Sequence, residues 1–379
     1  MVCMIQFRNI SKTWVFPVLL LMLFSAQGVG QNTDANSDDE GYFWTDIRDF
    51  GLQGKGWDDL DFNRLPAKAE EMVREPVWNL SHHTAGFYVR FITNGNFIKA
   101  KWSLTGEPNY MNHFAATGVS GLDLYVKLED GSWHWLGIGR PEGKENTVFL
   151  TEILPEGTRE YMMYLPLYNG INHVKIGIPE SYEIKGVTPD NGKPIVFYGT
   201  SITQGGCASR PGMCATAILG RRLDREIINL GFSGNGQMEP EVGRLLAELD
   251  PLIYFLDCIP NMDADMVKER VEPFVTILRE AHPDTPIILA EGVTYNNAFL
   301  IEDSRVRNSE CRSALRMAYE NLLAGGTRNL YYQIAEGQLG FDGEGTVDGV
   351  HPTDLGFHRQ ANAYQPLLES IMQALEDAE

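Results

Sequence analysis

Positive charge is scarce in this sequence. Its 379 residues include 31 Lys and Arg against 51 Asp and Glu, which gives a formal net charge of -20. A nucleic-acid-binding protein needs a basic surface to neutralise phosphates, and binding to anionic lipid headgroups makes the same demand. The composition therefore argues against a nucleic-acid partner and against electrostatic docking to a membrane.

Cysteine is scarce as well, with five in the chain. Cys3 lies in the N-terminal segment, and the other four are Cys207, Cys214, Cys258 and Cys311. Their spacing does not match Cys-x-x-Cys or the Cys and His pattern of a zinc site. The histidines, His113 among them, have no metal-ligand spacing either, so the sequence predicts no metal site.

Long hydrophobic runs are absent except at the N-terminus. Arg8 and Lys12 precede an apolar run over residues 14–26, and small residues follow in "SAQGVGQ". This order predicts a signal peptide over residues 1–30, with an uncleaved anchor as the alternative. The run is short for a membrane span and no cysteine follows it, so we expect a periplasmic or secreted protein without a stable span.

The chain then changes character twice. Residues 31–41 are polar and acidic, which predicts a disordered lead. Residues 42–184 consist of short alternating runs, which predict an antiparallel β-sandwich domain. Three stretches with Gly-containing turns favour hairpins: "FYVRFITNGNFIKAKWSL", "GLDLYVKLEDGSWHWLGIG" and "EYMMYLPLYNGINHVKIGI". Residues 185–194 carry Pro and Gly and are predicted to be a linker.

Residues 195–379 alternate apolar strands with helical segments. The strands are "IVFYG", "EIINLG", "LIYFLDC", "TPIILAEG" and "NLYYQIA", and Asp263 is a predicted N-cap of the helix after the third. This alternation predicts an α/β fold with a doubly wound parallel five-stranded sheet. Ligands of such sheets bind beyond the carboxyl ends of the strands.

Ser201 stands at such an end, directly after the first strand, where it could start a helix or act as a nucleophile. Asp348 and His351, in "DGVHP", are close enough for the carboxylate to orient the imidazole, unless His351 is an ordinary loop residue. "NLGFSGNG" and "DCIPNM" follow the second and third strands and could supply oxyanion donors. Four such features at matching strand ends favour an acyl-transfer site.

These blocks resemble those of the SGNH hydrolases, the GDSL esterase and lipase superfamily. "GTSIT", "NLGFSGNG", "IPNM" and "DGVH" are similar to the first, second, third and fifth family blocks. The resemblance implies Ser201 as nucleophile, His351 as base and Asp348 as its partner. It also implies an oxyanion hole of Ser201, Gly234 and Asn261, a flavodoxin-like topology, and neither metal nor cofactor.

The third block departs from the family pattern, which makes Asn229 and Asn235 alternatives to Asn261. Asn235 is also a candidate for substrate binding. So is Arg210, on the loop after Ser201, although a structural salt bridge is an equal alternative.

Cys207 and Cys258 follow the first and third strands, which are neighbours in a flavodoxin-like sheet, so a disulfide is possible. A bridge from Cys207 to Cys214 and four free thiols are the alternatives.

"GLDLY" is similar to the Gly-x-Asp-Leu-Tyr signature of a β-sandwich domain found ahead of some SGNH esterases. Together the resemblances imply an exported bacterial serine esterase that hydrolyses short acyl esters, acetyl above all, on a small molecule or a carbohydrate. An acyltransferase and a catalytically silent glycan-binding protein are the alternatives.

Overall fold

A computed structural model describes residues 41–107, 110–187 and 192–378 of the chain. The predicted signal peptide and all but the last residue of the predicted acidic lead lie outside these residues, as do residues 188–191 of the predicted linker. Across the described residues, no helix is both long and apolar enough to cross a membrane.

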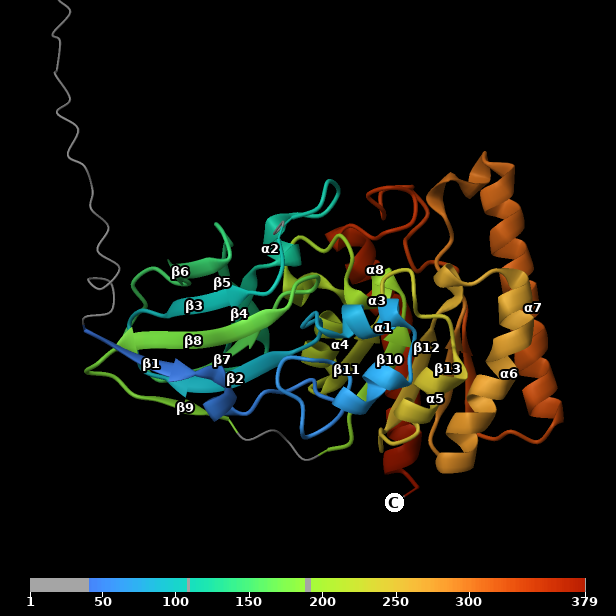
Figure 1. The fold of residues 1–379 in the computed structure, drawn as a ribbon, viewed down its shortest axis with the longest axis horizontal. Helices are drawn as coiled ribbons and strands as arrows, with labels where there is room; N and C mark the ends of the chain where they lie inside the picture. The colour runs from blue at the N-terminus through green and yellow to red at the C-terminus, as the bar shows by residue number, and fades with distance from the viewer. Residues whose placement is uncertain (1–40, 108–109, 188–191, 379) are drawn as a thin grey trace, which may run out of the picture. The chain divides into compact units, whose positions relative to one another are not determined.

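Two antiparallel sheets form from the N-terminal half, as the alternating runs predicted (Figure 1). One has the order β1-β8-β3-β6 and the other β5-β4-β7-β2-β9. Phe91, Trp102 and Leu124 belong to the apolar core that both sheets share. The strands are β1 (Tyr42–Asp46), β2 (Tyr88–Thr93), β3 (Lys99–Leu104), β4 (Leu122–Lys127), β5 (Trp133–Gly139), β6 (Glu145–Phe149), β7 (Arg159–Tyr164), β8 (Ile171–Pro179) and β9 (Ile184–Gly186).

Only one of the three predicted hairpins is present. β4 pairs with β5 across "EDG" as expected. The other two predictions are wrong, because β2 and β3 lie in different sheets, as do β7 and β8. In the connection from β2 to β3, Ile98 is fully buried and Gly95 packs against Ile178, so this segment crosses the end of the core.

Short helical segments connect the strands of this half. The sequence "AKAEE" forms η2, and α1 begins four residues after η2 ends. The segments are η1 (Ile47–Phe50), η2 (Ala67–Glu71), α1 (Glu75–Ser81) and α2 (Ala116–Val119).

The C-terminal half is a parallel five-stranded sheet of order β11-β10-β12-β13-β14, as in flavodoxin-like folds. The predicted fold class is therefore confirmed. The strands are β10 (Ile195–Gly199), β11 (Ile227–Gly231), β12 (Ile253–Asp257), β13 (Ile287–Ala290) and β14 (Leu330–Gln333).

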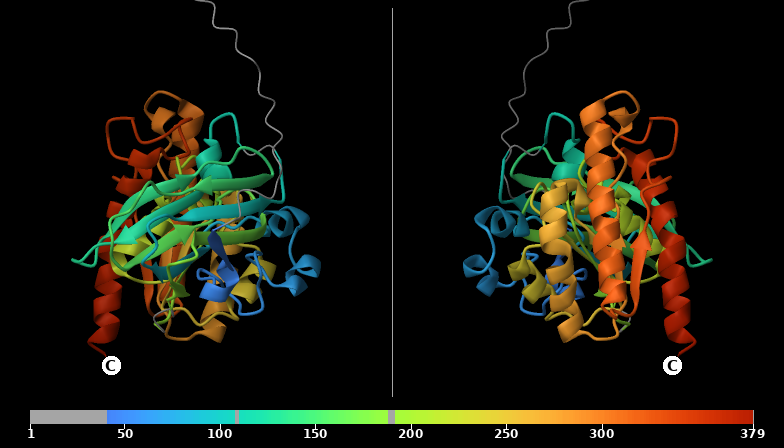
Figure 2. Two further views of the ribbon diagram at one scale, coloured as in Figure 1. Left: turned by 90° about the vertical axis from the view of Figure 1, so that its left-hand side faces the viewer. Right: turned by 90° about the vertical axis from the view of Figure 1, so that its right-hand side faces the viewer.

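Helices cover both faces of this sheet because successive strand residues point to opposite sides. Val196 and Tyr198 belong to the apolar cluster that includes α5, α6 and α7, whereas Ile195 and Phe197 belong to the cluster with α4 and α8. Figure 2 shows α6 and α7 side by side. The helices are α3 (Ser201–Gln204), η3 (Pro211–Met213), α4 (Ala215–Leu223), α5 (Pro240–Leu246), η4 (Ile259–Asn261), α6 (Ala264–Ala281), η5 (Asn296–Phe299), α7 (Glu302–Ala324) and α8 (Asp354–Glu376).

The sandwich half packs directly on the parallel sheet. Tyr125 and Tyr164 of the sandwich belong to the same apolar cluster as α4 and α8. A Cβ at Gly86 would lie 2.5 Å from the Cβ of Asn229 in β11, so glycine is required for this close approach. The fully buried Arg64 donates to the carbonyls of Asn229 and Gly231 and thereby ties the first half to the end of β11.

Candidate active site

Ser201 is the first residue of α3 and follows the buried strand β10. The N-cap role belongs to Thr200, whose side chain accepts a hydrogen bond from the N–H of Ile202. The Oγ of Ser201 lies 2.8 Å from the Nε2 of His351. The residue is 8% exposed, so its hydroxyl sits in a largely dry site that still opens to solvent.

His351 is held by Asp348 from the same loop. Its Nδ1 lies 2.8 Å from the Oδ2 of Asp348, and its backbone N–H donates to the Oδ1 of that carboxylate at 2.8 Å. The backbone N–H of Val350 donates to the same Oδ1 at 3.0 Å. The loop therefore orients the carboxylate and the imidazole together.

The electrostatics of this pair favour an ionised carboxylate. Partial burial raises the pKa of Asp348, but the hydrogen bonds from His351 and Val350 outweigh it and hold the pKa below its ordinary value. An ionised Asp348 accepts a hydrogen bond from the Nδ1–H of His351, which leaves the Nε2 lone pair facing the Ser201 hydroxyl. The three side chains can therefore transfer a proton from Ser201 to His351.

Two backbone donors lie in the loops beside Ser201. Among the described residues, neither the N–H of Ser201 nor that of Gly234 has a protein acceptor. Gly234 has a φ of +70°, and a Cβ added there would meet nothing within 4 Å. The second loop thus leaves its N–H uncovered, as an oxyanion donor requires.

Asn261 lies in η4, after β12, where its Nδ2 donates to the carbonyl of Phe232 at 3.2 Å. That bond connects the third-block loop to the second-block loop. Arg307 of α7 supports the same loop by donating to the carbonyls of Ile259, Pro260 and Met262. The sequence patterns did not indicate this role of Arg307, because a helical arginine is usually solvated.

The two alternative asparagines have other partners. Asn229 is buried and donates to the carbonyl of Thr203 and to the hydroxyl of Thr216. Asn235 donates to the carbonyl of Ser233 and accepts from Arg74. Both amides therefore stabilise loops, as the amide of Asn261 does through the carbonyl of Phe232.

Arg210 forms a salt bridge, which is the predicted alternative to substrate binding. Its Nη1 donates to the Oδ2 of Asp123 at 2.8 Å and to the hydroxyl of Tyr125 at 2.5 Å. Asp123 also accepts from the N–H of Gly212 at 2.8 Å and from the indole of Trp135. The "GLDLY" signature thus binds the loop that follows the nucleophile.

The predicted disulfide between Cys207 and Cys258 is wrong, because all four described cysteines are free thiols. Cys258 packs on the α5–α7 side of the parallel sheet, and Cys207 packs on the α4 and α8 side. The loop that carries Cys207 therefore lies on the other side of the sheet from Cys258, so the two thiols do not meet. Cys214 is also unpaired, and its thiol donates to the carbonyl of Pro211.

A groove of about 600 Å³ is lined from both halves, and Tyr168 of its lining contacts Ser201. Tyr168, from the sandwich half, donates to the carbonyl of Ser201 at 3.0 Å, and the Nδ1 of His83 accepts from the Nε2 of Gln204 at 3.1 Å. Ser233 and Asn235 line its other side. Sequence motifs missed Tyr168 because its neighbourhood reads as an ordinary strand connection.

Two family profiles match this chain. The GDSL-like lipase/acylhydrolase family matches residues 192–369, and the N-terminus of SGNH-hydrolase-type esterases matches residues 42–184. Among curated proteins, no significant sequence match is found.

Solved structures show the same two-part arrangement. A Bacteroides ovatus protein described as a GDSL-like lipase is 35% identical, with 88% of this chain and 98% of that one covered and a TM-score of 0.84. A salicylyl acyltransferase from a tetracycline biosynthetic pathway is 19% identical over 89% and 98%, with a TM-score of 0.67. A family two carbohydrate esterase from Cellvibrio japonicus is 14% identical over 88% and 99%, with a TM-score of 0.56.

The last two likenesses show a shared fold, whereas the first combines fold with substantial identity over nearly the full length. Together with the family profiles and the Ser201, Asp348 and His351 geometry, it establishes that this chain belongs to the GDSL-like lipase/acylhydrolase family, with the N-terminal domain of SGNH-type esterases.

Proposed function

We propose that this protein is an exported serine esterase that removes short acyl groups, acetyl above all, from a carbohydrate. The observation that carries the proposal is the continuous hydrogen-bond chain from Ser201 through His351 to Asp348. Export rests on the predicted signal peptide over residues 1–30, which lies outside the described residues.

The reaction proceeds through an acyl-serine intermediate. Ser201 Oγ attacks the ester carbonyl while His351 Nε2 takes its proton, and the N–H groups of Ser201 and Gly234 with the amide of Asn261 stabilise the oxyanion. His351 then protonates the departing alcohol. Water, activated by the same imidazole, releases the acid and restores Ser201.

The chemistry of the adjoining groove supports a polar alcohol. Its lining offers hydrogen-bonding groups on Asn79, His83, Ser233 and Asn235, an aromatic wall at Tyr168, and an apolar part at Pro76, Leu80 and Met111. Hydroxyl-rich ligands need such groups, whereas a long acyl chain needs a continuous apolar surface. A lining that combines hydrogen-bonding groups with an aromatic ring supports the proposal of a sugar as the alcohol part of the ester.

Replacing Ser201 by Ala tests the enzymatic assignment. We expect hydrolysis of p-nitrophenyl acetate to fall by roughly 10⁴-fold or more, because the nucleophile is lost while the fold is kept. Labelling with a fluorophosphonate should disappear in the same variant. Ser313→Ala, at an exposed position on α7, is the matched control and should behave as wild type.

Hydrolysis at the wild-type rate by Ser201→Ala would refute the assignment, and an unlabelled wild-type protein would favour the silent binding protein instead. Acetate release from a panel of acetylated polysaccharides tests the alcohol part. Transfer of the acyl group to an added sugar without acetate release would identify an acyltransferase.

A further inference from the structure

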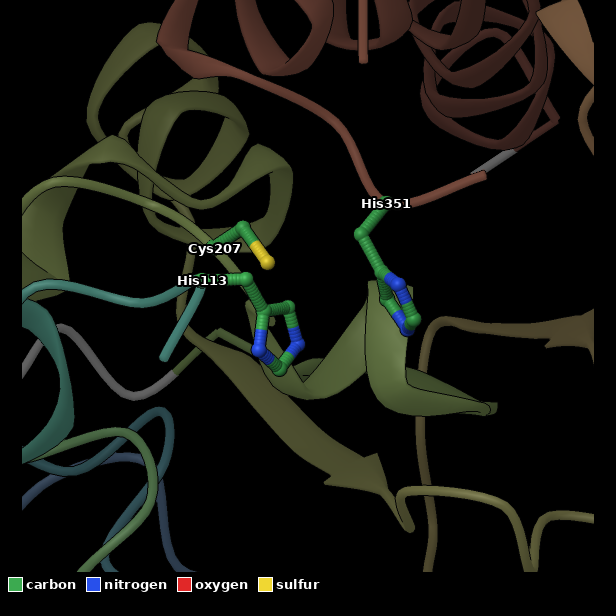
Figure 3. Close-up of side chains that lie close together, drawn as sticks. All are labelled: His113, Cys207 and His351. Atoms are coloured by element: carbon green, nitrogen blue, oxygen red, sulfur yellow. The ribbon is translucent and has the colours of Figure 1, made fainter. Parts of the chain in front are cut away.

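His113, Cys207 and His351 come together beside the nucleophile (Figure 3). Each offers one potential ligand atom, and the three atoms lie within 4.8 Å of one another. Imidazole nitrogen and thiolate sulfur are the ligands that Zn²⁺ prefers in proteins. The esterase mechanism uses His351 and leaves His113 and Cys207 without a role.

His113 is held in place by a tight turn. Backbone hydrogen bonds run in both directions between Met111 and Phe114, at 3.1 and 3.2 Å, and close the turn around it. Phe114 is buried and packs edge-on against Tyr168. The imidazole of His113 thus lies over the active site, with its ring centre 5.8 Å from that of His351.

Cys207 has an unusual backbone for a residue with a side chain. Its φ is +78°, in the left-handed region, and such a conformation costs roughly 1–2 kcal/mol in an L-residue. The thiol is largely buried, and no hydrogen bond of it is found within the described residues. Ester hydrolysis does not explain why the loop holds an unpartnered thiol at this position.

The two imidazoles are each held by an oxygen acceptor at Nδ1. His351 Nδ1 is bonded to the carboxylate of Asp348, and His113 Nδ1 lies 2.7 Å from the amide oxygen of Asn112. Each Nε2 lone pair can therefore bind a metal, that of His351 in exchange for its hydrogen bond with the Ser201 hydroxyl. An oxygen acceptor on the opposite ring nitrogen is the usual arrangement of zinc-binding histidines, because it fixes the tautomer and the ring orientation.

We propose that His113 Nε2, Cys207 Sγ and His351 Nε2 bind a Zn²⁺ ion, and that this ion reversibly inhibits the enzyme. Ligand atoms around tetrahedral zinc lie about 3.5 Å apart. Side-chain rotations that bring the three atoms about 1 Å closer to one another therefore complete the site. The sulfur–zinc bond forms as the Cys207 thiol releases its proton to solvent, and no electrons are transferred. A water molecule takes the fourth position.

Inhibition follows from competition for one lone pair, and this part rests on the proposed function. The Nε2 lone pair of His351 accepts the proton of Ser201 during catalysis. The same lone pair cannot bind a metal at that moment. Occupancy of the site by Zn²⁺ therefore removes the general base without modifying the nucleophile.

Metal binding is tested first without reference to activity. The chelator-treated mature protein is titrated with Co²⁺, whose absorption spectrum contains a thiolate charge-transfer band when Cys207 is a ligand. The Zn²⁺ affinity is measured by calorimetry. We expect one ion per chain, the cobalt band in wild type, and at least tenfold weaker Zn²⁺ binding in both Cys207→Ser and His113→Gln.

The controls are Cys311→Ser and His82→Gln, which change the same residue types outside the cluster and should bind Zn²⁺ as wild type does. If Cys207→Ser does not fold, His113→Gln decides alone. Absence of the cobalt thiolate band, or wild-type Zn²⁺ affinity in His113→Gln, overturns the site.

Inhibition is tested with p-nitrophenyl acetate. Zn²⁺ should suppress wild-type hydrolysis, and a chelator should restore it. Cys207→Ser and His113→Gln should keep their basal activity and need at least tenfold more Zn²⁺ for half-inhibition. Zn²⁺ that binds with a cobalt thiolate band but leaves hydrolysis unchanged would refute the inhibitory role, whereas a metal-free wild type that is inert would refute the proposed function instead.

Discussion

The adjacent hydroxyl residues Thr200 and Ser201 have different partners at the start of α3. Thr200 caps the helix by accepting from the N–H of Ile202, and the hydroxyl of Ser201 is thereby left for His351. The sequence alone left Ser201 equally suited to capping and to catalysis. The choice between these roles depends on which hydroxyl points along the backbone and which points at an imidazole 150 residues away.

Removing the amide of Asn261 tests the third oxyanion donor. We expect Asn261→Ala to reduce the kcat for p-nitrophenyl acetate by about 10²–10³-fold, because one preorganised donor to the oxyanion is lost. The KM should change much less, since the donor acts mainly in the transition state.

Asn235→Ala is the matched comparison, because Asn235 is the alternative third-block residue and its amide is bonded to Ser233 and Arg74. We expect a change of less than tenfold in kcat. A larger loss in Asn235→Ala than in Asn261→Ala would show that Asn235 is the true third-block residue.

At the scale of elements, β4 holds the loop that follows Ser201. Asp123 is fully buried and accepts from both Arg210 and the N–H of Gly212, while Tyr125 contacts the same arginine. A buried carboxylate needs such partners, since an unpaired one would be too costly. The signature strand of the sandwich is thus a docking element for the catalytic half.

Replacing Asp123 by Asn should loosen this docking. The change removes the charge partner of Arg210 and one acceptor of the Gly212 N–H, so we expect the free energy of unfolding to fall by about 1–3 kcal/mol. Urea denaturation followed by tryptophan fluorescence measures this. Asp265→Asn, at an exposed position on α6, should leave the midpoint unchanged, and an equal midpoint for both variants would contradict the docking role.

Local patterns predicted elements better than pairings. β10 was predicted at its observed bounds, and Asp263 caps α6 by accepting from the N–H of Met266, as expected. The Asn-Gly turn after β2 did not produce a hairpin, since the buried Ile98 draws the next segment into the other sheet. Burial over the core decided the pairing against the local turn preference.

At the scale of the whole molecule, the two halves share apolar clusters, and the buried Arg64 joins them through hydrogen bonds. Arg64 donates to four carbonyls, of Leu80, His83, Asn229 and Gly231, and its guanidinium lies over the ring of Phe232. These bonds fix one wall of the groove against the end of β11. The sandwich therefore contributes to the geometry around the site as well as to stability.

The stability of the whole fold should depend on pH through Asp257, which lies fully buried at the end of β12. One of its oxygens accepts from Tyr364, and the other has no partner among the described residues. Burial raises its pKa from 3.8 to about 7, despite that hydrogen bond. Between these two values the folded protein holds a proton that the unfolded chain has released, so stability falls as pH rises through this window.

Asp257→Asn, which is neutral at every pH, should therefore gain stability relative to wild type as pH rises from about 4 to about 7, by up to about 1.4 kcal/mol per pH unit. Above that range the difference should stay constant. Denaturation midpoints of both proteins across pH 4–8 measure it. A difference that does not vary with pH would show that Asp257 is ionised in the folded protein even at the acidic end.

The sequence by itself determined the fold class, the order of strands and helices in the C-terminal half, and the candidate residues Ser201, Asp348 and His351. These follow from hydrophobic periodicity and from short motifs, which act over a few residues.

Only the tertiary structure decided what depends on faces and distant contacts. It placed Cys207 and Cys258 on opposite sides of the sheet. It also paired Arg210 with Asp123 in a salt bridge and brought His113 close to His351. Such outcomes follow from which side of a strand each side chain leaves and which segments pack together. No local spacing encodes that information, because the residues concerned are separated by tens to hundreds of positions in the chain.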